Sequence, residues 1–267
     1  MALFPTIVKT TAAAVDVIRR PATGLVVLVY HRVGGHTAVT VDLPTPTFDA
    51  QMAQLAASGA VLTIDDAVTA LAAGEDLAGR VVVTFDDGTA DFVDEALPVL
   101  DRHSVPATLY VATGHVEDGI DFPDDGRPAS WGGLADCVAS GLVTIGSHTH
   151  GHILLDRLDV ASVADDLDRS IGLIGERLGT VAEHFAYPKA LSPTAEAERE
   201  VRARFRSAAI AGTRANPPGG DVHRLHRTPI QTTDGERFFA RKLAGGLGWE
   251  DDVRRLVNRR RYAGATT

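Results

Sequence analysis

Short apolar runs alternate with segments of helical periodicity from residue 24 onward. The apolar runs have the length of buried strands, and the segments between them repeat apolar residues every three or four positions, as amphipathic helices do. The expected strands are 24–31, 60–64, 80–88, 106–114, 142–148, 183–188 and 206–212, and the expected helices are 47–59, 65–74, 90–103, 130–141, 158–179 and 194–205. This alternation predicts βα units around a parallel sheet, which either closes as a barrel or stays open and doubly wound.

The chain has 267 residues, of which 45% are hydrophobic, and this is enough for one α/β domain with a buried core. We find neither an internal repeat nor a clear linker, and therefore expect a single domain over 24–267. Residues 1–23 form an N-terminal extension in which Ile7, Val15 and Ile18 have helical spacing. Because a basic face is missing, we expect this extension to pack on the domain rather than to rest on a membrane.

The charge pattern argues against a nucleic-acid partner. The net charge is -9, and the one basic cluster, Arg259 to Arg261, is typical of a solvated helix end. No apolar run reaches the length of about 18 residues that a transmembrane segment needs. The first residues lack the order of a secretory signal, since Arg19 and Arg20 follow the apolar part. We therefore expect a cytoplasmic protein, with action outside the cell or at a membrane surface as the alternative. The abundance of Ala, Arg and Gly favours a bacterial source.

Polar side chains with metal-binding chemistry follow two of the predicted strands. Asp86 and Asp87 follow the run VVVTF, and His148, His150 and His152 follow the run LVTIGS. Because the carboxyl ends of parallel strands meet on one face of a sheet, we expect both sets there. Two imidazoles and one carboxylate are a common catalytic zinc set, with a further position left to water or substrate.

The spacing within the two sets assigns different tasks to neighbouring residues. His148 and His152 are four positions apart, so one turn of chain can direct both at the same ion, and His150 then points elsewhere. Side chains of adjacent residues diverge at an extended strand end, so one of Asp86 and Asp87 should bind metal and the other should transfer a proton. A lone DDG is usually a turn, but its placement with the histidines behind two core strands favours a site. The single cysteine, Cys137, excludes a cysteine-based zinc cage.

These motifs resemble those of the polysaccharide deacetylase family, that is, the NodB homology domain or carbohydrate esterase family 4. TFDDG resembles the first motif of the family, and SHTHGH resembles the second, His-Ser/Thr-x-x-His. Further similar segments follow in the family's order over roughly residues 24–245, namely VLVYHRV, TFDAQMAQLAASG, LPVLDRHSVPATLYV, SWGGLADCVASG and FAYP. The resemblance implies a distorted (β/α)7 TIM-like barrel. It also implies a hydrolase that removes N-acetyl groups from an amino sugar in a polysaccharide or glycoconjugate.

The resemblance also implies the roles of four residues. Asp86 matches the general base of the family, and Asp87, His148 and His152 match its metal ligands. The expected cofactor is Zn2+, with Co2+ or Ni2+ as alternatives. In this scheme a metal-activated water attacks the acetamide carbonyl, Asp86 removes a proton from it, and the metal and a backbone N–H stabilise the oxyanion.

The third motif departs from the common Arg-x-Pro-Tyr. The chain reads Phe185-Ala186-Tyr187-Pro188-Lys189. Ala186 replaces the arginine, which resembles a subgroup with Phe-Ala-Tyr-Pro, and Lys189 stands where the tyrosine would be, which is less usual. We predict that Arg227, in RLHRTPI, supplies the missing cation beside the catalytic aspartate. The alternative is a surface arginine before a proline turn.

The remaining histidines and aromatic residues give further candidates. His226 is the predicted general acid, and His31 is either an alternative acid or a hydrogen-bonding partner behind the site. The residues expected to contact substrate are His31, Trp131, Tyr187 and Lys189, of which the two aromatic residues would stack on a sugar and Lys189 would meet an acidic group or an oxyanion. We expect loop, helix-end or surface positions for His36, His103, His115, His184 and His223.

Two other functions fit the same residues. Related enzymes open cyclic amides or imides on this scaffold with the same metal. A carbohydrate-binding protein that has lost catalysis is the second alternative, because Ala186 and Lys189 depart from the active motif. The intact Asp86, Asp87, His148 and His152 favour an enzyme.

Overall fold

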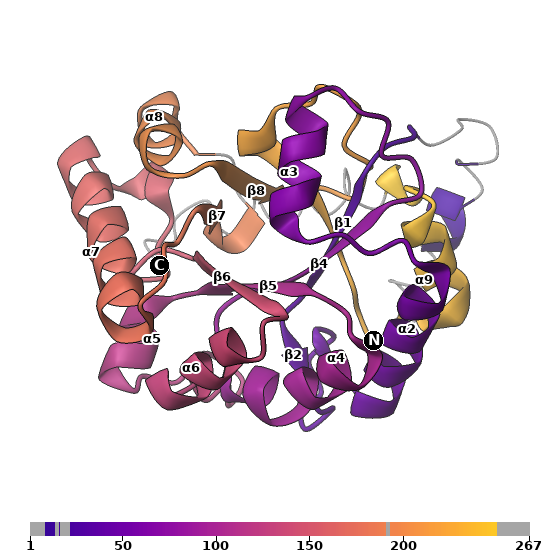
Figure 1. The fold of residues 1–267 in the computed structure, drawn as a ribbon, viewed down its shortest axis with the longest axis horizontal. Coiled ribbons are helices and arrows are strands. Elements are labelled where there is room, and N and C mark those ends of the chain that lie inside the picture. Colours follow the sequence, from indigo (N-terminus) through magenta and orange to yellow (C-terminus); the bar gives the residue numbers. More distant parts are fainter. Residues whose placement is uncertain (1–8, 14–15, 17–21, 191–192, 250–267) are drawn as a thin grey trace.

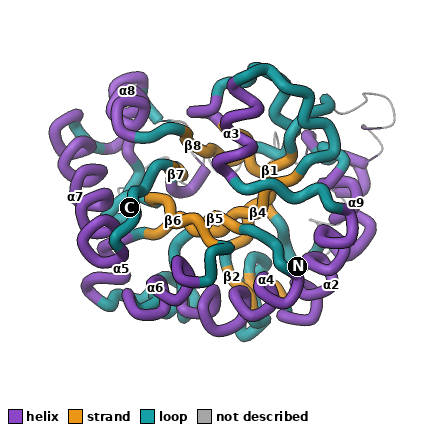
Figure 2. Tube along the Cα trace, in the orientation of Figure 1, coloured by secondary structure: helices purple, strands orange, loops and turns teal. Residues whose placement is uncertain are grey.

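The computed structural model describes residues 9–13, 16, 22–190 and 193–249. Within this part of the chain, seven parallel strands close into a barrel in the order β1-β4-β5-β6-β7-β8-β9, and helices surround it (Figures 1 and 2). The barrel strands are β1 (Val26–Tyr30), β4 (Val81–Phe85), β5 (Ala107–Val111), β6 (Val143–Ser147), β7 (His184–Ala186), β8 (Ser207–Ala211) and β9 (Leu225–Pro229). The predicted (β/α)7 barrel is therefore confirmed, and the open doubly wound sheet is excluded.

The helices that follow the strands cover the outside of the barrel. They are α2 (Thr45–Ser58), α3 (Ile64–Ala72), α4 (Leu97–His103), α5 (Thr113–Asp118), α6 (Trp131–Ala139), α7 (Val160–Leu178), α8 (Ala195–Arg204) and α9 (Gly235–Leu243). Short helical turns are η1 (Phe92–Ala96), η2 (Leu155–Arg157), η3 (Pro188–Ala190) and η4 (Val222–Arg224), and a small two-stranded sheet consists of β2 (Arg32–Val33) and β3 (Asp42–Leu43).

Side-chain caps explain where several helices begin. The oxygens of Thr63, Ser130, Asp159 and Thr194 each accept a backbone N–H of the first turn. The helix expected over 47–59 starts earlier, at Thr45, because Pro44 and Pro46 favour a helix start without needing a hydrogen-bonded N–H.

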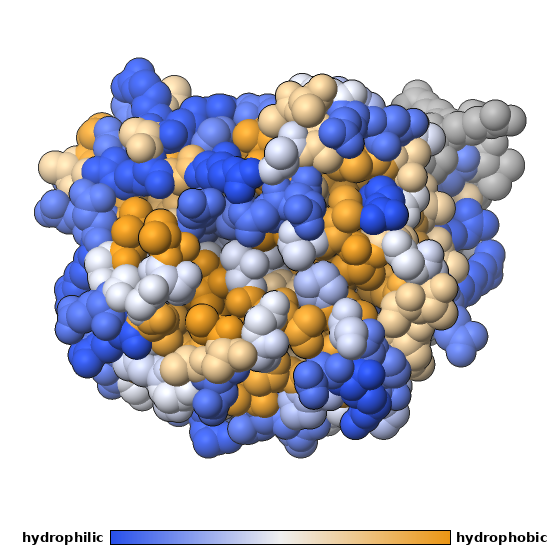
Figure 3. Space-filling model, viewed as in Figure 1, coloured by the Kyte–Doolittle hydropathy of each residue, from blue (hydrophilic) through white to orange (hydrophobic). Residues whose placement is uncertain are grey.

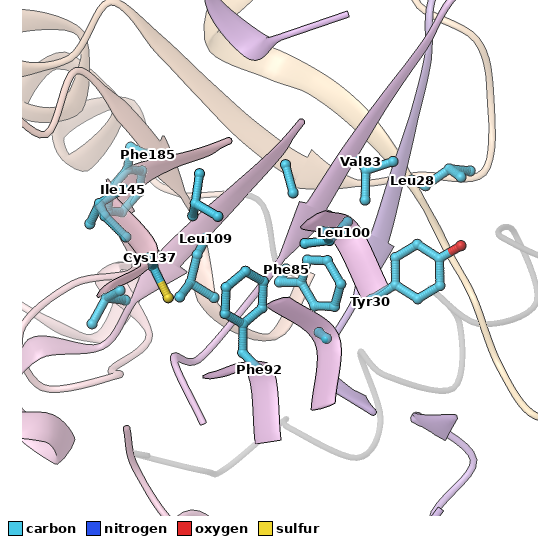
Figure 4. Packing of buried hydrophobic residues seen from close by; sticks show 14 of the residues in the cluster. Leu28, Tyr30, Val83, Phe85, Phe92, Leu100, Leu109, Cys137, Ile145 and Phe185 are labelled. Carbon is cyan, nitrogen blue, oxygen red and sulfur yellow. The ribbon is translucent and has the colours of Figure 1, made fainter. Parts of the chain in front are cut away.

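The strands are buried on both sides, which is why they read as continuous apolar runs. All residues of β1 and β4 are buried. Their outward side chains pack beneath the helices, and Figure 4 shows Phe85 next to Phe92 and Tyr30. The ring centroids of Phe85 lie 4.8 Å from Phe92 and 5.2 Å from Tyr30. This aromatic cluster fixes the strand ends that carry the candidate site.

The barrel interior contains one large ring among small side chains. Tyr110 is buried there with Ala186 and Ala209. A Cβ atom at Gly146 would lie 2.6 Å from the Tyr110 ring, so only glycine at this position of β6 leaves room for the ring.

One predicted strand is wrong. Residues 60–64 form only an isolated bridge between Val61 and Val81, and Ile64 already begins α3. The side chain of Thr63 caps this helix by accepting the N–H of Asp66, so the chain turns into a helix instead of extending. Residues of α3, among them Val68 and Leu71, then pack with interior strand residues.

Residues 9–13 are helical and lie beside α9 (Figure 1). Ala12 and Ala13 are buried against Phe238 and Leu247. The rest of the predicted N-terminal helix and the basic cluster Arg259 to Arg261 lie outside the described residues. None of the described helices has the length and apolar character that a membrane crossing requires.

The surface is mostly hydrophilic over the outer helices. Figure 3 shows polar residues over α7 and α8, and hydrophobic residues gathered in the middle of the same face, where β5 and β6 lie in Figure 1. This pattern follows from the amphipathic helices, which turn their polar sides outward.

Candidate active site

A pocket with a cavity volume of about 360 Å³ opens at the carboxyl ends of the barrel strands. Side chains that follow different strands converge on it, including His31 after β1, Asp86 after β4 and His148 after β6. Ligands of α/β barrels bind at this end of the strands. The topology thus brings together the polar residues that the sequence places behind separate apolar runs.

The two adjacent aspartates point in different directions. Asp86 continues β4, since its N–H donates to the carbonyl of Tyr30 over 3.1 Å. Asp87 has a φ of 74° and Gly88 one of 86°, so the chain leaves the strand through two left-handed residues. Aspartate tolerates this conformation better than most residues. The turn directs the Asp87 carboxylate toward the histidines and leaves Asp86 facing Arg227.

Asp87, His148 and His152 form a compact group of potential metal ligands. The Oδ1 atom of Asp87 lies 3.2 Å from His152 Nε2 and 3.6 Å from His148 Nε2, and one ligand atom from each residue lies within 4.8 Å of the others. The Nδ1 atom of His148 lies 2.8 Å from the carbonyl of Ala186. An Nδ1–H that donates to this carbonyl leaves the lone pair of Nε2 facing Asp87.

The electrostatics of this group suit a cation. Burial lowers the pKa of His148 to about 4, so its imidazole is neutral at ordinary pH, as a metal ligand must be. Burial of Asp87 opposes its ionisation, but the hydrogen bond and the charge of His152 outweigh that effect, and its pKa lies well below the ordinary value. One carboxylate oxygen and two imidazole nitrogens are a ligand set that fits a divalent metal.

Asp166 of α7 holds the loop between the two histidines. Its Oδ1 accepts the N–H of His150 and its Oδ2 accepts the N–H of Gly151, both over 2.8 Å. His152 has a φ of 51°, a conformation that costs free energy in a residue other than glycine. Asp166 offsets this cost by bonding the loop from outside the pocket.

Asp86 forms a buried ion pair with Arg227 of β9. The Nη2 atom of Arg227 donates to Asp86 Oδ2 over 2.8 Å, and Nη1 donates to Oδ1. Burial opposes the ionisation of Asp86, but the charge of Arg227 and its hydrogen bonds outweigh that effect, so the pKa of Asp86 lies below its ordinary value. His31 Nε2 is 3.9 Å from Asp86 Oδ2. Asp86 is therefore a charged, oriented carboxylate beside the metal-ligand group.

The acidic loop between α5 and α6 forms one wall of the pocket. Phe122 stacks on His115 with centroids 4.0 Å apart and meets the ring of His152 edge-on at 5.7 Å. Arg32 anchors the loop, because its Nη1 donates to the carbonyl of Asp124 over 2.6 Å and its Nε donates to Asp91 over 2.9 Å. Sequence reasoning missed this anchor, although Arg32 directly follows His31 at a strand end.

Two of the residues expected to contact substrate line the pocket, namely His31 and Lys189. The two aromatic residues, Trp131 and Tyr187, do not line the pocket. Tyr187 is 3% exposed and packs in the outer core, with its ring centroid 4.9 Å from that of Phe185. Trp131 begins α6, and its Nε1 donates to Glu117 over 2.7 Å. The structure therefore does not support sugar stacking on Trp131 and Tyr187.

His226 is not among the residues that line the pocket. Arg227 points into the barrel, and successive side chains of a strand point to opposite faces, so His226 faces away. This geometry does not support His226 as the general acid. His184, expected at a loop, helix-end or surface position, is instead fully buried at the start of β7, and its Nδ1 lies 2.8 Å from Ser207 Oγ.

A second group of potential ligands, Asp65, Glu183 and His184, lies at the opposite end of β7. His184 Nε2 already contacts Asp65 Oδ1 at 3.1 Å. Arg206 Nη1 lies 2.6 Å from Asp65 Oδ1 and 3.6 Å from Glu183 Oε2. A guanidinium therefore already neutralises both carboxylates, and this group is a structural ion-pair network.

Comparison with solved structures identifies proteins of the same architecture. IcaB from Ammonifex degensii is 28% identical over 84% of this chain and 99% of its own, with a TM-score of 0.70. The deacetylase PplD of Streptococcus pyogenes, solved in complex with acetate, is 19% identical over 84% and 99% of the two chains, with a TM-score of 0.72. BC0361, a polysaccharide deacetylase from Bacillus cereus, is 22% identical over 82% and 68%, with a TM-score of 0.67. At these lower identities, PplD and BC0361 show the shared fold alone.

A search of the curated proteins finds no match. The family model for polysaccharide deacetylase matches residues 73–206, a span that includes Asp86, Asp87, His148 and His152. The sequence resemblance, the barrel and the family model agree, and the chain belongs to the polysaccharide deacetylase family.

Proposed function

We propose that this protein is a metal-dependent hydrolase, with zinc as its metal, that removes N-acetyl groups from an amino sugar in a polysaccharide or glycoconjugate. The observation that carries the proposal is the division of labour between adjacent aspartates. Asp87 faces His148 and His152, whereas Asp86 is paired with Arg227 a few ångströms away. A binding protein does not require a buried, oriented carboxylate beside a set of metal ligands.

Asp87, His148 and His152 would hold the metal through Oδ1 and the two Nε2 atoms. A divalent ion bound there supplies Lewis acidity, which polarises the acetamide carbonyl and lowers the pKa of a water molecule. The carbonyl of Ala186 and the carboxylate of Asp166 keep the imidazoles and their loop in place.

Asp86 accepts the proton of the attacking water. Arg227 keeps this carboxylate ionised and fixes its orientation through two hydrogen bonds, so that it acts as a base. His31 lines the pocket beside Asp86 and is positioned to protonate the leaving amine, a role for which His226 is on the wrong side of its strand. Lys189 lines the pocket, and its backbone N–H is our candidate for the donor that stabilises the oxyanion.

Acetate release from an N-acetylglucosamine oligomer tests the proposal when it is measured together with metal content. We expect Asp86→Asn to keep the metal and lose turnover by a factor of about 10² to 10⁴, the usual contribution of a general base. His148→Ala should lose both metal and turnover. If the wild-type protein opens a cyclic amide and releases no acetate from the oligomer, the deacetylase assignment is wrong.

A further inference from the structure

The N-terminal segment reaches the wall of the pocket through Lys9. Figure 1 shows the first described residues next to α9, and Ala12 and Ala13 are buried there with Phe238 and Leu247. Lys9 is only 1% exposed, although lysine is almost never fully buried unless it is paired. This residue lies far outside the span that the family model matches.

The ammonium of Lys9 contacts the segment between β9 and α9. Its Nζ donates to Gln231 Oε1 over 3.2 Å, to Thr233 Oγ1 over 2.6 Å and to Asp234 Oδ1 over 2.6 Å. These contacts join residues more than 200 positions apart in the chain. Charge-assisted hydrogen bonds of this kind are short and strong, and they hold both partners in one geometry.

Asp234 connects Lys9 to a second buried lysine. Its Oδ2 accepts the ammonium of Lys242 over 2.8 Å and the N–H of Gln231 over 2.7 Å. Lys242 also donates to the carbonyl of Pro229 over 2.6 Å. The segment from Pro229 to Asp234 is thus bonded near both of its ends by two buried cations that share one carboxylate.

This segment forms part of the substrate pocket. Pro229 and Gln231 line it, together with Val39 and Val41 from the loop after β2. The two stretches are joined by a hydrogen bond from the N–H of Thr232 to the carbonyl of Thr40 over 2.8 Å. The wall therefore continues directly from Arg227 on β9, yet it is composed of residues outside the matched family span.

We propose that Lys9 is a positioning residue for substrate. By bonding Gln231, Thr233 and Asp234 it fixes the wall formed by Val39, Val41, Pro229 and Gln231, and the N-terminal segment thereby sets substrate affinity. The inference rests on the proposed deacetylase function for its substrate. It assigns to residues before the barrel a role in binding the sugar, while the chemistry stays with the strand-end residues.

Lys9→Met removes the ammonium but keeps most of the side-chain volume, and Thr233→Val removes one of its acceptors without touching a pocket residue. Arg199→Met is the matched control, because Arg199 is an exposed cation of α8 with a side chain 72% exposed. Acetate release gives KM and kcat, elemental analysis gives metal content, and amide hydrogen exchange reports the order of residues 230–234.

We expect Lys9→Met to raise KM by about tenfold, the effect of losing roughly 1.4 kcal/mol of binding, with kcat and metal content close to wild type. Thr233→Val should raise KM less. Both variants should exchange the amides of 230–234 faster than wild type and Arg199→Met. A folded Lys9→Met with wild-type KM and exchange would overturn the inference. If Lys9→Met does not fold, Thr233→Val is the deciding variant. A wild-type KM together with wild-type exchange in Thr233→Val also overturns the inference.

Failure of the proposed function is distinguishable from failure of this inference. A wild-type protein that releases no acetate refutes the deacetylase function, and the amide exchange of residues 230–234 still shows whether Lys9 orders the wall.

Discussion

Arg227 donates hydrogen bonds to both carboxylate oxygens of Asp86, across 141 residues of sequence. Ala186 stands where the common form of the third motif has an arginine, and its side chain is buried in the barrel interior. The cation beside the carboxylate of Asp86 therefore comes from β9 instead of β7. The backbone carbonyl of Ala186 still bonds His148, a contact that does not depend on its side chain.

Replacing Arg227 with Met should lower kcat by about 10² or more while metal content stays near wild type, as expected when a general base is impaired. The buried Asp86 would lose its counter-charge, its pKa would rise, and the acidic limb of the pH–rate profile would move to higher pH. Arg224→Met is the control, since Arg224 is half-exposed and pairs with Glu198. Equal losses of turnover and metal in Arg227→Met would contradict the role of Arg227.

Replacing Asp166 with Ala should weaken metal binding by about 10- to 100-fold, the usual effect of removing a group that orients a ligand. The N–H groups of His150 and Gly151 would lose their acceptor, and the loop that carries His152 would relax from its left-handed conformation. Titration of metal into the metal-free protein measures this change. Asp165 lies on the exposed side of α7, so Asp165→Ala should bind metal as wild type does. Equal metal affinities of Asp166→Ala and Asp165→Ala would contradict a role of Asp166 in orienting the ligand loop.

The metal-free protein should lose stability as the pH falls from about 6.5 toward 4. Burial lowers the pKa of His148 to about 4 from the ordinary 6.5, so between these values the unfolded chain binds more protons than the folded one. The free energy of unfolding is therefore highest above pH 6.5, and it decreases by about 3 kcal/mol as the pH approaches 4. Thermal unfolding of chelator-treated wild type and His148→Gln between pH 7 and 4.5 measures the effect. Equal slopes of Tm against pH would contradict it.

Replacing Arg32 with Met should loosen the loop that carries Phe122. The carbonyl of Asp124 and the carboxylate of Asp91 would each lose a donor, and a buried group left without its partner costs about 1 to 3 kcal/mol. We expect a lower Tm and a higher KM for the sugar. Arg102→Met, at a side chain that is 60% exposed, is the control. A wild-type KM in a destabilised Arg32→Met would restrict Arg32 to a structural role.

The barrel could be predicted from the sequence because its buried strands are continuous apolar runs. The run that contains β4 is apolar from Val81 to Val83 and ends in charged residues, and such runs recur with helical segments between them. The run 60–64 carries the same signal, but the cap at Thr63 begins a helix there. Strand β9 and helix α9 are not predicted as elements, because Leu225–Pro229 mixes polar and apolar residues although it closes the barrel.

The candidate site was predictable where chemistry and strand ends coincide. Asp86, Asp87, His148 and His152 stand directly behind core strands, so residue type and position agree. Residues that act from a distance have no such signal. Asp166 and Lys9 contact the site or its wall only once α7 and the N-terminal segment are packed. Tyr187 shows the reverse case, since an aromatic side chain at a strand end proves to face the core.

The dependence of deacetylation on a metal at Asp87, His148 and His152 is tested by measuring acetate release by metal-free protein as zinc is added back. We predict no release without metal, activity that rises in proportion to added zinc and stops rising at one equivalent per chain, and no recovery in His152→Ala. Acetate release by the metal-free protein, or full zinc binding without any release of acetate, would contradict this prediction.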